Sequence, residues 1–293
     1  MTSMIRLERT DARSRSTALL VDAACPDVAT VAARLPRLRD AFSARLHAGP
    51  APGEALRLDA PDAALLEAWL AAEMQAQDGA DDKLAAAYLL GRVAFAVSEV
   101  LAALALQGLQ PARLAPDAVA LTARRAAWHL DEQSGEGRAY DIVLAGSDLV
   151  PCGAPAAMLG AALPELLAQL VLYLIDRSGL SRGALWRLVG DALSGALLIQ
   201  GKHVRREEEA MEIAHAVLRD RQSPLYSRQT GYFRIDLPER PDIAEWFRAR
   251  GGCCRYYTTE GGAYCSTCVL RDPESREALL RAHLRRKHGL DGT

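Results

Sequence analysis

Four cysteines near the C-terminal end have the residue type and spacing of a metal centre. Cys253, Cys254, Cys265 and Cys268 form the pattern C-C-x10-C-x2-C. A C-x2-C loop can turn two sulfurs toward the same point, as it does in many metal sites. An iron–sulfur cluster needs four thiolates that converge on one compact inorganic core. The four thiols together therefore predict an iron–sulfur cluster with these cysteines as its ligands.

The adjacent pair, Cys253 and Cys254, requires a bent backbone. Neighbouring Cα atoms are only about 3.8 Å apart across a trans peptide. In a regular strand the two side chains would point to opposite faces. We expect the glycine pairs at 251–252 and 261–262 to supply the conformational freedom that the bend needs.

A second metal pattern overlaps the first. Cys265, Cys268, His283 and His288 also fit the spacing of a two-cysteine, two-histidine zinc site. That site would leave the adjacent cysteine pair unused, and it lacks the β-hairpin that a ββα zinc finger places before its helix. A structural or redox disulfide, or a cluster with histidine ligands, is a further alternative. The all-cysteine cluster is the interpretation that we favour.

Composition limits the class of protein. The 293 residues include 35 Lys and Arg against 37 Asp and Glu, and this near-neutral balance argues against a nucleic-acid partner. Residues 1–16 are polar and carry no secretion signal, so we expect a disordered N-terminus and a reducing, cytoplasmic location. The isolated Cys25 and Cys152 are expected to be ordinary thiols.

The apolar pattern predicts a mainly α fold with a small antiparallel β element, in the α+β class. Ala and Leu are abundant, which favours helix. Asp62 and Ser181 are each placed to cap a helix, and residues 82–107 form the longest helical candidate. Alternating apolar residues on both sides of a turn-rich stretch predict a β-hairpin or meander around 118–145.

The apolar stretch 154–175 is long enough to raise the question of a membrane span. Pro164, Glu165 and Gln169 interrupt it. We therefore expect no transmembrane segment.

Shorter patterns complete the predicted elements. We expect an N-terminal helix from Val28 to Phe42, a charged amphipathic helix at 203–221, a strand at 231–238, a short helix from Asp242 through Phe247, and a basic helix from Glu274 to Lys287.

The chain is predicted to have three parts. These are the disordered residues 1–16, a mainly helical substrate-binding body at 17–245, and a C-terminal segment at 246–293 with the cysteines and the basic helix. We expect the cysteine loop to pack on the helical body at the mouth of a cleft.

The sequence around the cysteines resembles the FhuF-like ferric-siderophore reductases over roughly residues 246–270. The resemblance rests on the C-C-x10-C-x2-C pattern, on the aromatic pair Tyr256–Tyr257, and on the Gly-Gly pair before the second two cysteines. In that family four cysteines bind a [2Fe–2S] cluster, so the resemblance implies a [2Fe–2S] cofactor on the same four cysteines here. Arg255 departs from the family pattern, where an apolar residue is expected, and this change bears on the polarity around the cluster.

The resemblance implies a siderophore-iron reductase of iron homeostasis. Such an oxidoreductase passes one electron to a cytoplasmic ferric siderophore and releases ferrous iron, with no catalytic residue beyond the cluster. The sequence contains no Gly-rich dinucleotide fingerprint and no P-loop, so we expect electrons from a donor protein of the ferredoxin or reductase type. Basic and aromatic residues beside the cysteines are the expected contacts of an anionic chelate: Arg248, Arg250, Arg255, Tyr256 and Tyr257.

Two other functions stay open at this point. One is a zinc-stabilised binding module that uses the two-cysteine, two-histidine site. The other is a non-catalytic electron-transfer or iron-sensing protein that uses the same cluster. The sequence also leaves open whether the protein is peripheral at the inner membrane.

Overall fold

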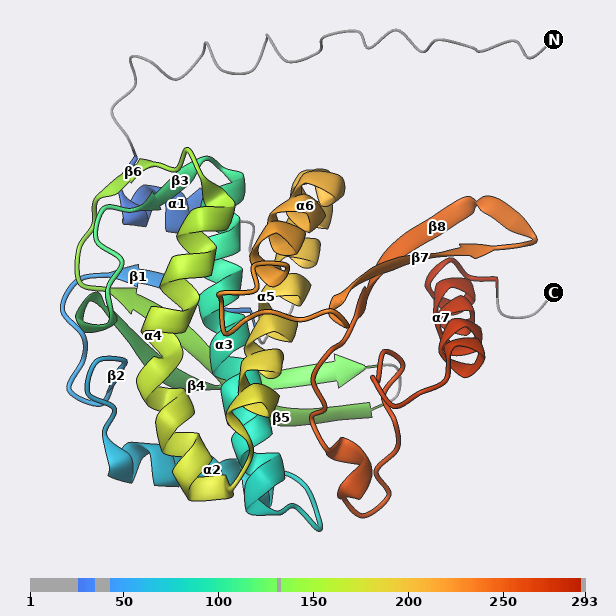
Figure 1. Cartoon of the computed structure of the whole chain (residues 1–293), viewed down its shortest axis with the longest axis horizontal. Helices are drawn as coiled ribbons and strands as arrows, with labels where there is room; N and C mark the ends of the chain where they lie inside the picture. Colours follow the sequence, from blue (N-terminus) through green and yellow to red (C-terminus); the bar gives the residue numbers. More distant parts are fainter. Residues whose placement is uncertain (1–25, 35–42, 131–132, 291–293) are drawn as a thin grey trace, which may run out of the picture.

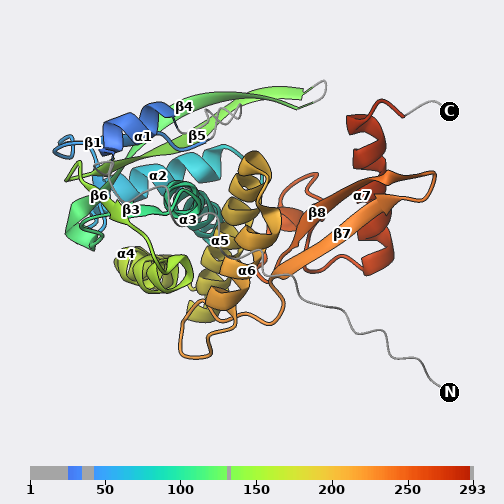
Figure 2. The same cartoon turned by 90° about the horizontal axis from the view of Figure 1, so that it is seen from above.

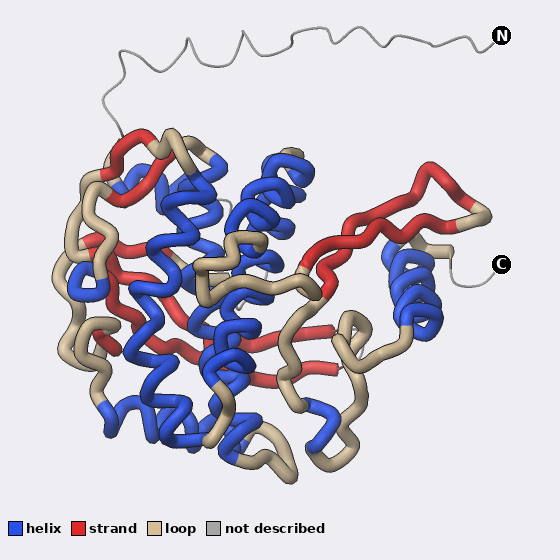
Figure 3. The backbone as a smooth tube through the Cα atoms, viewed as in Figure 1, coloured by secondary structure: helices blue, strands red, loops and turns tan. Residues whose placement is uncertain are grey.

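The structure is a computed structural model that describes residues 26–34, 43–130 and 133–290. Its helices form a bundle with a small sheet on one side, and a separate hairpin and helix form the C-terminal end (Figures 1 and 3). This arrangement confirms the predicted α+β class. The predictions for residues 1–16 and for Cys25 lie outside the described residues.

Helix α3 (Asp82–Leu106) is the centre of the bundle, with α2 (Ala63–Gln75), α4 (Pro155–Ser178) and α5 (Arg182–Val204) packed around it. Seen from above, α2 and α3 lie between the sheet on one side and α4 on the other (Figure 2). Because α3 contacts both layers, nearly all its apolar side chains are buried, which explains the apolar composition of 82–107.

The predicted helix caps are confirmed. The side chain of Asp62 accepts a hydrogen bond from the N–H of Leu65 at 2.8 Å, and that of Ser181 accepts one from the N–H of Ala184 at 3.2 Å. Asp81 caps α3 in the same way, through the N–H of Leu84 at 2.7 Å. Such caps satisfy N–H groups that have no partner inside the helix.

The sheet has the strand order β1-β5-β4-β2. Its long hairpin joins β4 (Val119–Leu130) and β5 (Gln133–Leu144), which confirms the β element predicted around 118–145. β1 (Leu46–Ala48) pairs parallel to β5, and β2 (Leu56–Arg57) pairs antiparallel to β4. Three short elements, β3 (Leu109–Pro111), the 3-10 turn η1 (Pro116–Ala118) and β6 (Leu149–Pro151), connect the sheet to the helices.

The C-terminal elements are α6 (Glu207–Leu218), β7 (Gly231–Leu237), β8 (Arg240–Ala249), the 3-10 turn η2 (Tyr256–Thr258) and α7 (Pro273–Lys287). The hairpin β7–β8 and α7 share a small core of their own, made by Ile235, Leu237, Ile243, Leu280 and Leu284. The hairpin therefore packs with the C-terminal segment, while the domain boundaries drawn from the sequence remain predictions.

One predicted helix is wrong and a second is divided in the structure. The helix predicted from Asp242 through Phe247 is the strand β8. Phe247 stands opposite Phe233 of β7, and their rings stack with centroids 6.2 Å apart. Pairing across the hairpin outweighs the capping signal of Asp242, whose carboxylate instead accepts a hydrogen bond from Arg240 at 2.7 Å.

The helix predicted at 203–221 is divided, because α5 continues to Val204 and α6 begins at Glu207. At the N-terminal end, α1 (Val28–Arg34) covers the first part of the helix predicted from Val28 to Phe42, and residues 35–42 lie outside the described residues.

Helices α3 and α4 are the two described helices that are long and apolar enough to cross a membrane. The most apolar window of α3 is 83% buried inside the protein, as in the core helix of a folded domain, whereas that of α4 is 44% buried. Pro164 lies within α4, so the proline that interrupts the apolar run does not end the helix.

Candidate metal centre

The four clustered cysteines lie in the loop that joins β8 to α7. Cys253 and Cys254 follow β8, and Cys265 and Cys268 form a turn before α7, in which the N–H of Cys268 donates to the carbonyl of Cys265 at 3.0 Å. All four are free thiols. Cys268 is buried and the other three are half-buried, so the loop is shielded without being sealed from solvent.

Arg250 brings the two halves of the loop together. Its Nη1 lies 3.7 Å from Sγ of Cys254 and 3.6 Å from Sγ of Cys265. The hydrogen bond from the Cys265 thiol, assisted by the charge of Arg250, lowers the pKa of Cys254 to about 5. The same hydrogen bond raises the pKa of Cys265. Two sulfurs from separate parts of the sequence therefore share one cationic neighbour, a setting that favours the thiolate at Cys254.

Asp191 of α5 anchors the start of the loop. Its carboxylate is buried and accepts hydrogen bonds from the N–H of Gly251 at 2.8 Å and of Gly252 at 2.9 Å. It also accepts a hydrogen bond from the hydroxyl of Thr230 at 3.0 Å and pairs with Nε of Arg250 at 3.3 Å. One side chain thus fixes both the backbone before Cys253 and the arginine that reaches the sulfurs.

Sequence reasoning missed Asp191. The signal that could have found it is a single acidic residue in an otherwise apolar and small-residue stretch, LVGDALSG, within a capped helix. A buried carboxylate there requires a partner from another part of the chain.

The glycines before the adjacent cysteines act mainly through close packing. A Cβ atom at Gly251 would lie 2.4 Å from Oγ1 of Thr230, and one at Gly252 would lie 3.1 Å from the backbone N of Leu188 on α5. The left-handed residue beside the cysteine pair is instead Arg255, with φ of 65°. Of the glycines expected to supply conformational freedom, Gly261 adopts a left-handed conformation, with φ of +69°, whereas Gly251 and Gly252 do not.

Arg255 ties the cysteine loop to the helical bundle. Its guanidinium pairs with the capping carboxylate of Asp81 at 2.9 Å, and its N–H points to Sγ of Cys253 at 3.4 Å. The residue that departs from the family pattern therefore holds the loop against the start of α3.

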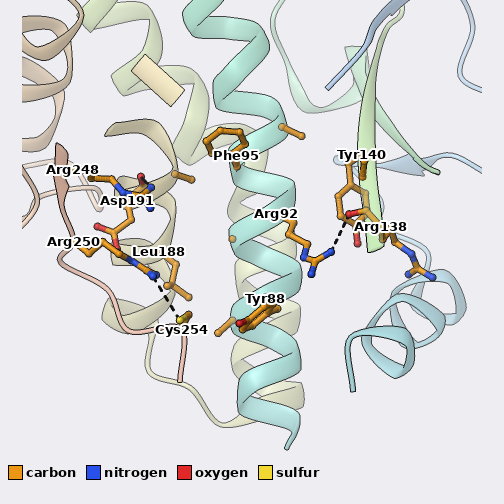
Figure 4. Close-up of a pocket in the computed structure, with 15 residues that line it drawn as sticks. Tyr88, Arg92, Phe95, Arg138, Tyr140, Leu188, Asp191, Arg248, Arg250 and Cys254 are labelled. Carbon is orange, nitrogen blue, oxygen red and sulfur yellow. Dashed lines mark hydrogen bonds and ion pairs between the residues drawn. The ribbon is translucent and has the colours of Figure 1, made fainter. Parts of the chain in front are cut away.

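A cavity of about 390 Å³ lies between α3, α5, β5 and the cysteine loop. Figure 4 shows Cys254 and Arg250 on one side of α3, and Arg92 reaching toward Arg138 and Tyr140 on the other side. The other principal lining residues of the cavity are Tyr88, Phe95, Leu188, Asp191 and Arg248. The adjacent cysteine pair thus contributes one sulfur-bearing side chain to the wall of a cavity.

The predicted substrate contacts divide into two groups. Arg248 and Arg250 line the cavity, whereas Arg255, Tyr256 and Tyr257 are not among its lining residues. Arg248 has a structural contact, since its guanidinium donates a hydrogen bond to the backbone carbonyl of Asp191 at 2.5 Å. Four further lining residues were not predicted, because helix α3 and strand β5 meet only in the folded chain: Tyr88, Arg92, Arg138 and Tyr140.

The two cysteines and two histidines of the zinc pattern do not converge on one site in the structure. The ring of His283 packs edge-on against Phe247, with centroids 6.3 Å apart, and His288 ends α7. Within the described ranges, no group of three or more His, Cys, Asp or Glu side chains is arranged to hold a single metal ion. A two-iron cluster divides its four ligands between two irons, so the cysteine loop does not need such a single-ion arrangement.

The donor chemistry of the loop fits a [2Fe–2S] cluster. Four free thiols are gathered, two of them within hydrogen-bonding reach of each other, and a half-buried cation lies beside the sulfurs. By site and fold, the protein has a cysteine loop suited to an iron–sulfur cluster, carried on an α-helical body.

The family comparison agrees with this class. Residues 250–270 match the family model described as the FhuF 2Fe-2S C-terminal domain, which confirms the predicted resemblance and the predicted [2Fe–2S] cofactor. The match covers the cysteine loop and leaves the helical body unassigned. No curated protein and no solved structure is similar enough to match the chain.

Replacing Arg250 with glutamine is expected to lower the reduction potential of the bound cluster by about 65–130 mV. In the wild type, the charge of Arg250 and its two N–H···S contacts stabilise the reduced, more negative state of the cluster, and the substitution removes them. A charge-assisted hydrogen bond contributes roughly 1.5–3 kcal/mol. For one electron, a tenfold change in the equilibrium constant corresponds to about 59 mV. A redox titration followed by electron paramagnetic resonance measures the potential. Arg250→Lys keeps the charge and should recover most of the shift; equal potentials for Arg250→Gln and the wild type would contradict the assigned role.

Proposed function

We propose that the protein is a ferric-siderophore reductase whose [2Fe–2S] cluster is held by Cys253, Cys254, Cys265 and Cys268. The observation that carries this proposal is the position of Cys254, which belongs both to the cysteine loop and to the wall of the cavity of about 390 Å³. A chelate in that cavity would lie against a cluster ligand. A purely structural metal site would have no need of such an adjoining space.

The chemistry follows from the two iron centres involved. A [2Fe–2S] cluster with four thiolate ligands supplies one electron at a time. The ferric ion of a siderophore is held by hard, anionic oxygen ligands. On reduction it becomes less charged and softer, so its bonds to those oxygens weaken and ferrous iron leaves.

The chain's own residues position the reactants. Asp191 and Arg250 fix the adjacent cysteines against α5, and Arg255 fixes the loop against α3. Phe95 and Leu188 supply apolar walls to the cavity. These contacts hold the loop and the cavity in one geometry, which keeps the distance for electron transfer short.

Electrons would arrive from a separate donor protein on the outer side of the loop. Tyr257 and Tyr264 form an exposed ring pair there, with centroids 5.2 Å apart. Exposed aromatic rings beside a redox site are suited to a transient protein contact. The donor is proposed to be of the ferredoxin or reductase type, and the reaction to take place in the cytoplasm.

The test is anaerobic stopped-flow mixing of chemically reduced protein with a panel of ferric siderophores. We expect the visible spectrum of the reduced protein to return to the oxidised form on mixing, together with appearance of ferrous iron in a chromogenic trap. Mixing with the iron-free siderophores is the control and should leave the protein reduced. Failure of every ferric siderophore to reoxidise the protein would leave an electron-transfer or iron-sensing role in place of the reductase.

A further inference from the structure

Gly91 lies in the interior of helix α3, where close packing does not account for a glycine. At Gly201 of α5, by comparison, a Cβ atom would lie 2.7 Å from Cβ of Ala210, so a close neighbour explains that glycine. A Cβ atom at Gly91 would meet no described atom within 4 Å, leaving aside its two chain neighbours and the backbone of its own helix. Glycine is less favourable than alanine inside a helix, so its presence at this position needs another explanation.

The position of Gly91 in the cavity wall supplies that explanation. Gly91 lines the cavity of about 390 Å³ that Cys254 also lines. It is half-buried, although most residues of α3 are buried, so a side chain here would extend into the cavity and not into the core. Glycine keeps this part of the cavity open and allows a ligand to lie against the helix backbone.

Two aromatic rings lie on either side of Gly91 along α3. Tyr88 and Phe95 are half-buried and line the same cavity, and Figure 4 shows their rings at different heights along the helix. Residues seven apart share a helix face and are separated by about 10.5 Å of axial rise. Gly91 lies between the two, within about 60° of each around the helix axis. The three residues form an aromatic notch, with Gly91 as its floor and a ring at each end.

The neighbouring side chains give the notch apolar surroundings. Arg92 extends from α3 toward β5, where its Nη1 donates to the backbone carbonyl of Arg138 at 3.1 Å (Figure 4). Its guanidinium carbon also lies 5.7 Å from the ring centroid of Tyr88, and this contact helps to fix the ring. Across the cavity, Leu188 and Ala192 of α5 form an apolar wall.

The spacing of the two rings suits a flat aromatic group. A third ring midway between them would have its centroid about 5 Å from each, inside the range of about 4.5–7 Å that favourable aromatic pairs adopt. An aliphatic group could fill the same space, but it would gain no ring–ring contact. Apolar, aromatic walls with a few polar groups are typical of sites for small molecules, and Arg250 and Cys254 are the polar groups beside the cysteine loop.

We infer that the aromatic notch binds an aryl group of the ferric chelate, while the iron of that chelate lies toward Cys254. The inference rests on the proposed function and names its substrate class: chelates with an aromatic ring next to the iron-binding group are preferred over aliphatic ones. Gly91 determines this specificity, because any side chain at its position would occupy the space of the aryl group.

The test compares two redox-inert probes that differ only in the group beside the metal-binding atoms. They are the gallium(III) complexes of benzohydroxamate and of acetohydroxamate, which carry a phenyl and a methyl group on the same hydroxamate. Isothermal titration calorimetry with the holoprotein measures the Kd of each complex. We expect the wild type to bind the phenyl complex about tenfold more tightly than the methyl complex, since the phenyl group adds apolar burial and ring contacts.

Substitutions of Gly91 separate ligand binding from folding. Gly91→Ala places a methyl group in open space and favours the helix, so the Tm should rise by about 1–4 °C. The same methyl group should weaken binding of the phenyl complex about threefold, an effect that a merely structural role for Gly91 would not produce. Gly91→Leu fills the notch and should abolish the preference for the phenyl complex.

Two other variants complete the comparison. Phe95→Leu removes one ring but keeps an apolar side chain, so it should lower the phenyl preference about threefold. Gly160→Ala is the matched control, because Gly160 lies in the interior of α4 and does not line this cavity, and a Cβ atom there would be 3.7 Å from Val217. It should keep the full preference.

Equal binding of the two gallium complexes by the wild type overturns the inference. Gly91→Leu that folds and keeps the full phenyl preference also overturns it. If Gly91→Leu does not fold, Gly91→Ala decides, and an unchanged Kd for the phenyl complex in that variant counts against the aryl site.

Because gallium(III) accepts no electron from the cluster, this outcome is separate from that of the proposed function. Binding of the phenyl complex that depends on Gly91, in a protein that no ferric siderophore reoxidises, would support the aryl site and overturn the reductase. Equal reduction of aryl and aliphatic ferric chelates, unaffected by the Gly91 variants, would support the reductase and overturn the aryl site.

Discussion

Cys254→Ser is expected to remove the visible absorbance of the protein and at least about nine-tenths of its bound iron, and to abolish reduction of ferric chelates. A serine oxygen replaces a thiolate that would ligate the cluster, and even changes outside the ligand set lower metal affinity roughly 10–100-fold. The substitution also removes the sulfur side chain in the cavity wall. Anaerobic purification with iron and acid-labile sulfide analysis measures the loss.

Cys152→Ser is the matched control for this prediction. Cys152 is also a free thiol, but it is buried and lies beside β6, outside the cysteine loop. Its replacement should leave the iron and sulfide content unchanged. His283→Ala should also keep the iron, because His283 packs on Phe247. Full iron content in Cys254→Ser, or loss of iron in His283→Ala, would contradict the all-cysteine assignment.

Asp191→Ala is expected to destabilise the protein by about 3–5 kcal/mol and to lower its iron content. The change leaves the guanidinium of Arg250, whose side chain is 14% exposed, without its buried carboxylate partner, and removal of one member of a buried ion pair has this size of effect. It also leaves the N–H groups of Gly251 and Gly252 without the acceptor that fixes them in front of Cys253. Urea unfolding of the protein as purified measures the free energy of unfolding.

Asp176→Ala is the control for Asp191→Ala. Asp176 lies on the exposed surface of α4, where substitutions usually change stability by less than about 0.5 kcal/mol. Asp191→Asn keeps the shape of the side chain and loses its charge, so its effect should fall between those of the wild type and Asp191→Ala. If Asp191→Ala unfolds at the same urea concentration as the wild type and keeps its iron, Asp191 is not the anchor of the loop.

The helical body was predictable because its signals are local. Asp62 and Ser181 precede apolar runs of helical period, and the caps form as expected. The hairpin at β4–β5 follows from alternation on both sides of a turn-rich stretch. At Asp242 a capping signal competed with pairing to β7, the strand that immediately precedes it in the chain; the strand pairing prevailed, and the predicted helix was wrong.

The surroundings of the cysteine loop were only partly predictable. Arg250 was expected to contact substrate, yet its guanidinium reaches two sulfurs and Asp191. Arg255 was expected beside a chelate, yet it pairs with Asp81. A basic residue near a metal site in the sequence has several anionic partners available in the folded chain, and the sequence does not say which it takes.

The sequence by itself determined the metal chemistry, because ligand type and spacing are properties of a single short segment and the four thiols lie within it. It also determined the helices that Asp62 and Ser181 cap, whose periodicity and caps are equally local. Only the tertiary structure decided what surrounds the thiols: the carboxylate of α5 that fixes the loop, and the cavity whose walls come from α3, α5 and β5. Those residues are far apart in the chain, and burial in a common core is what brings them together.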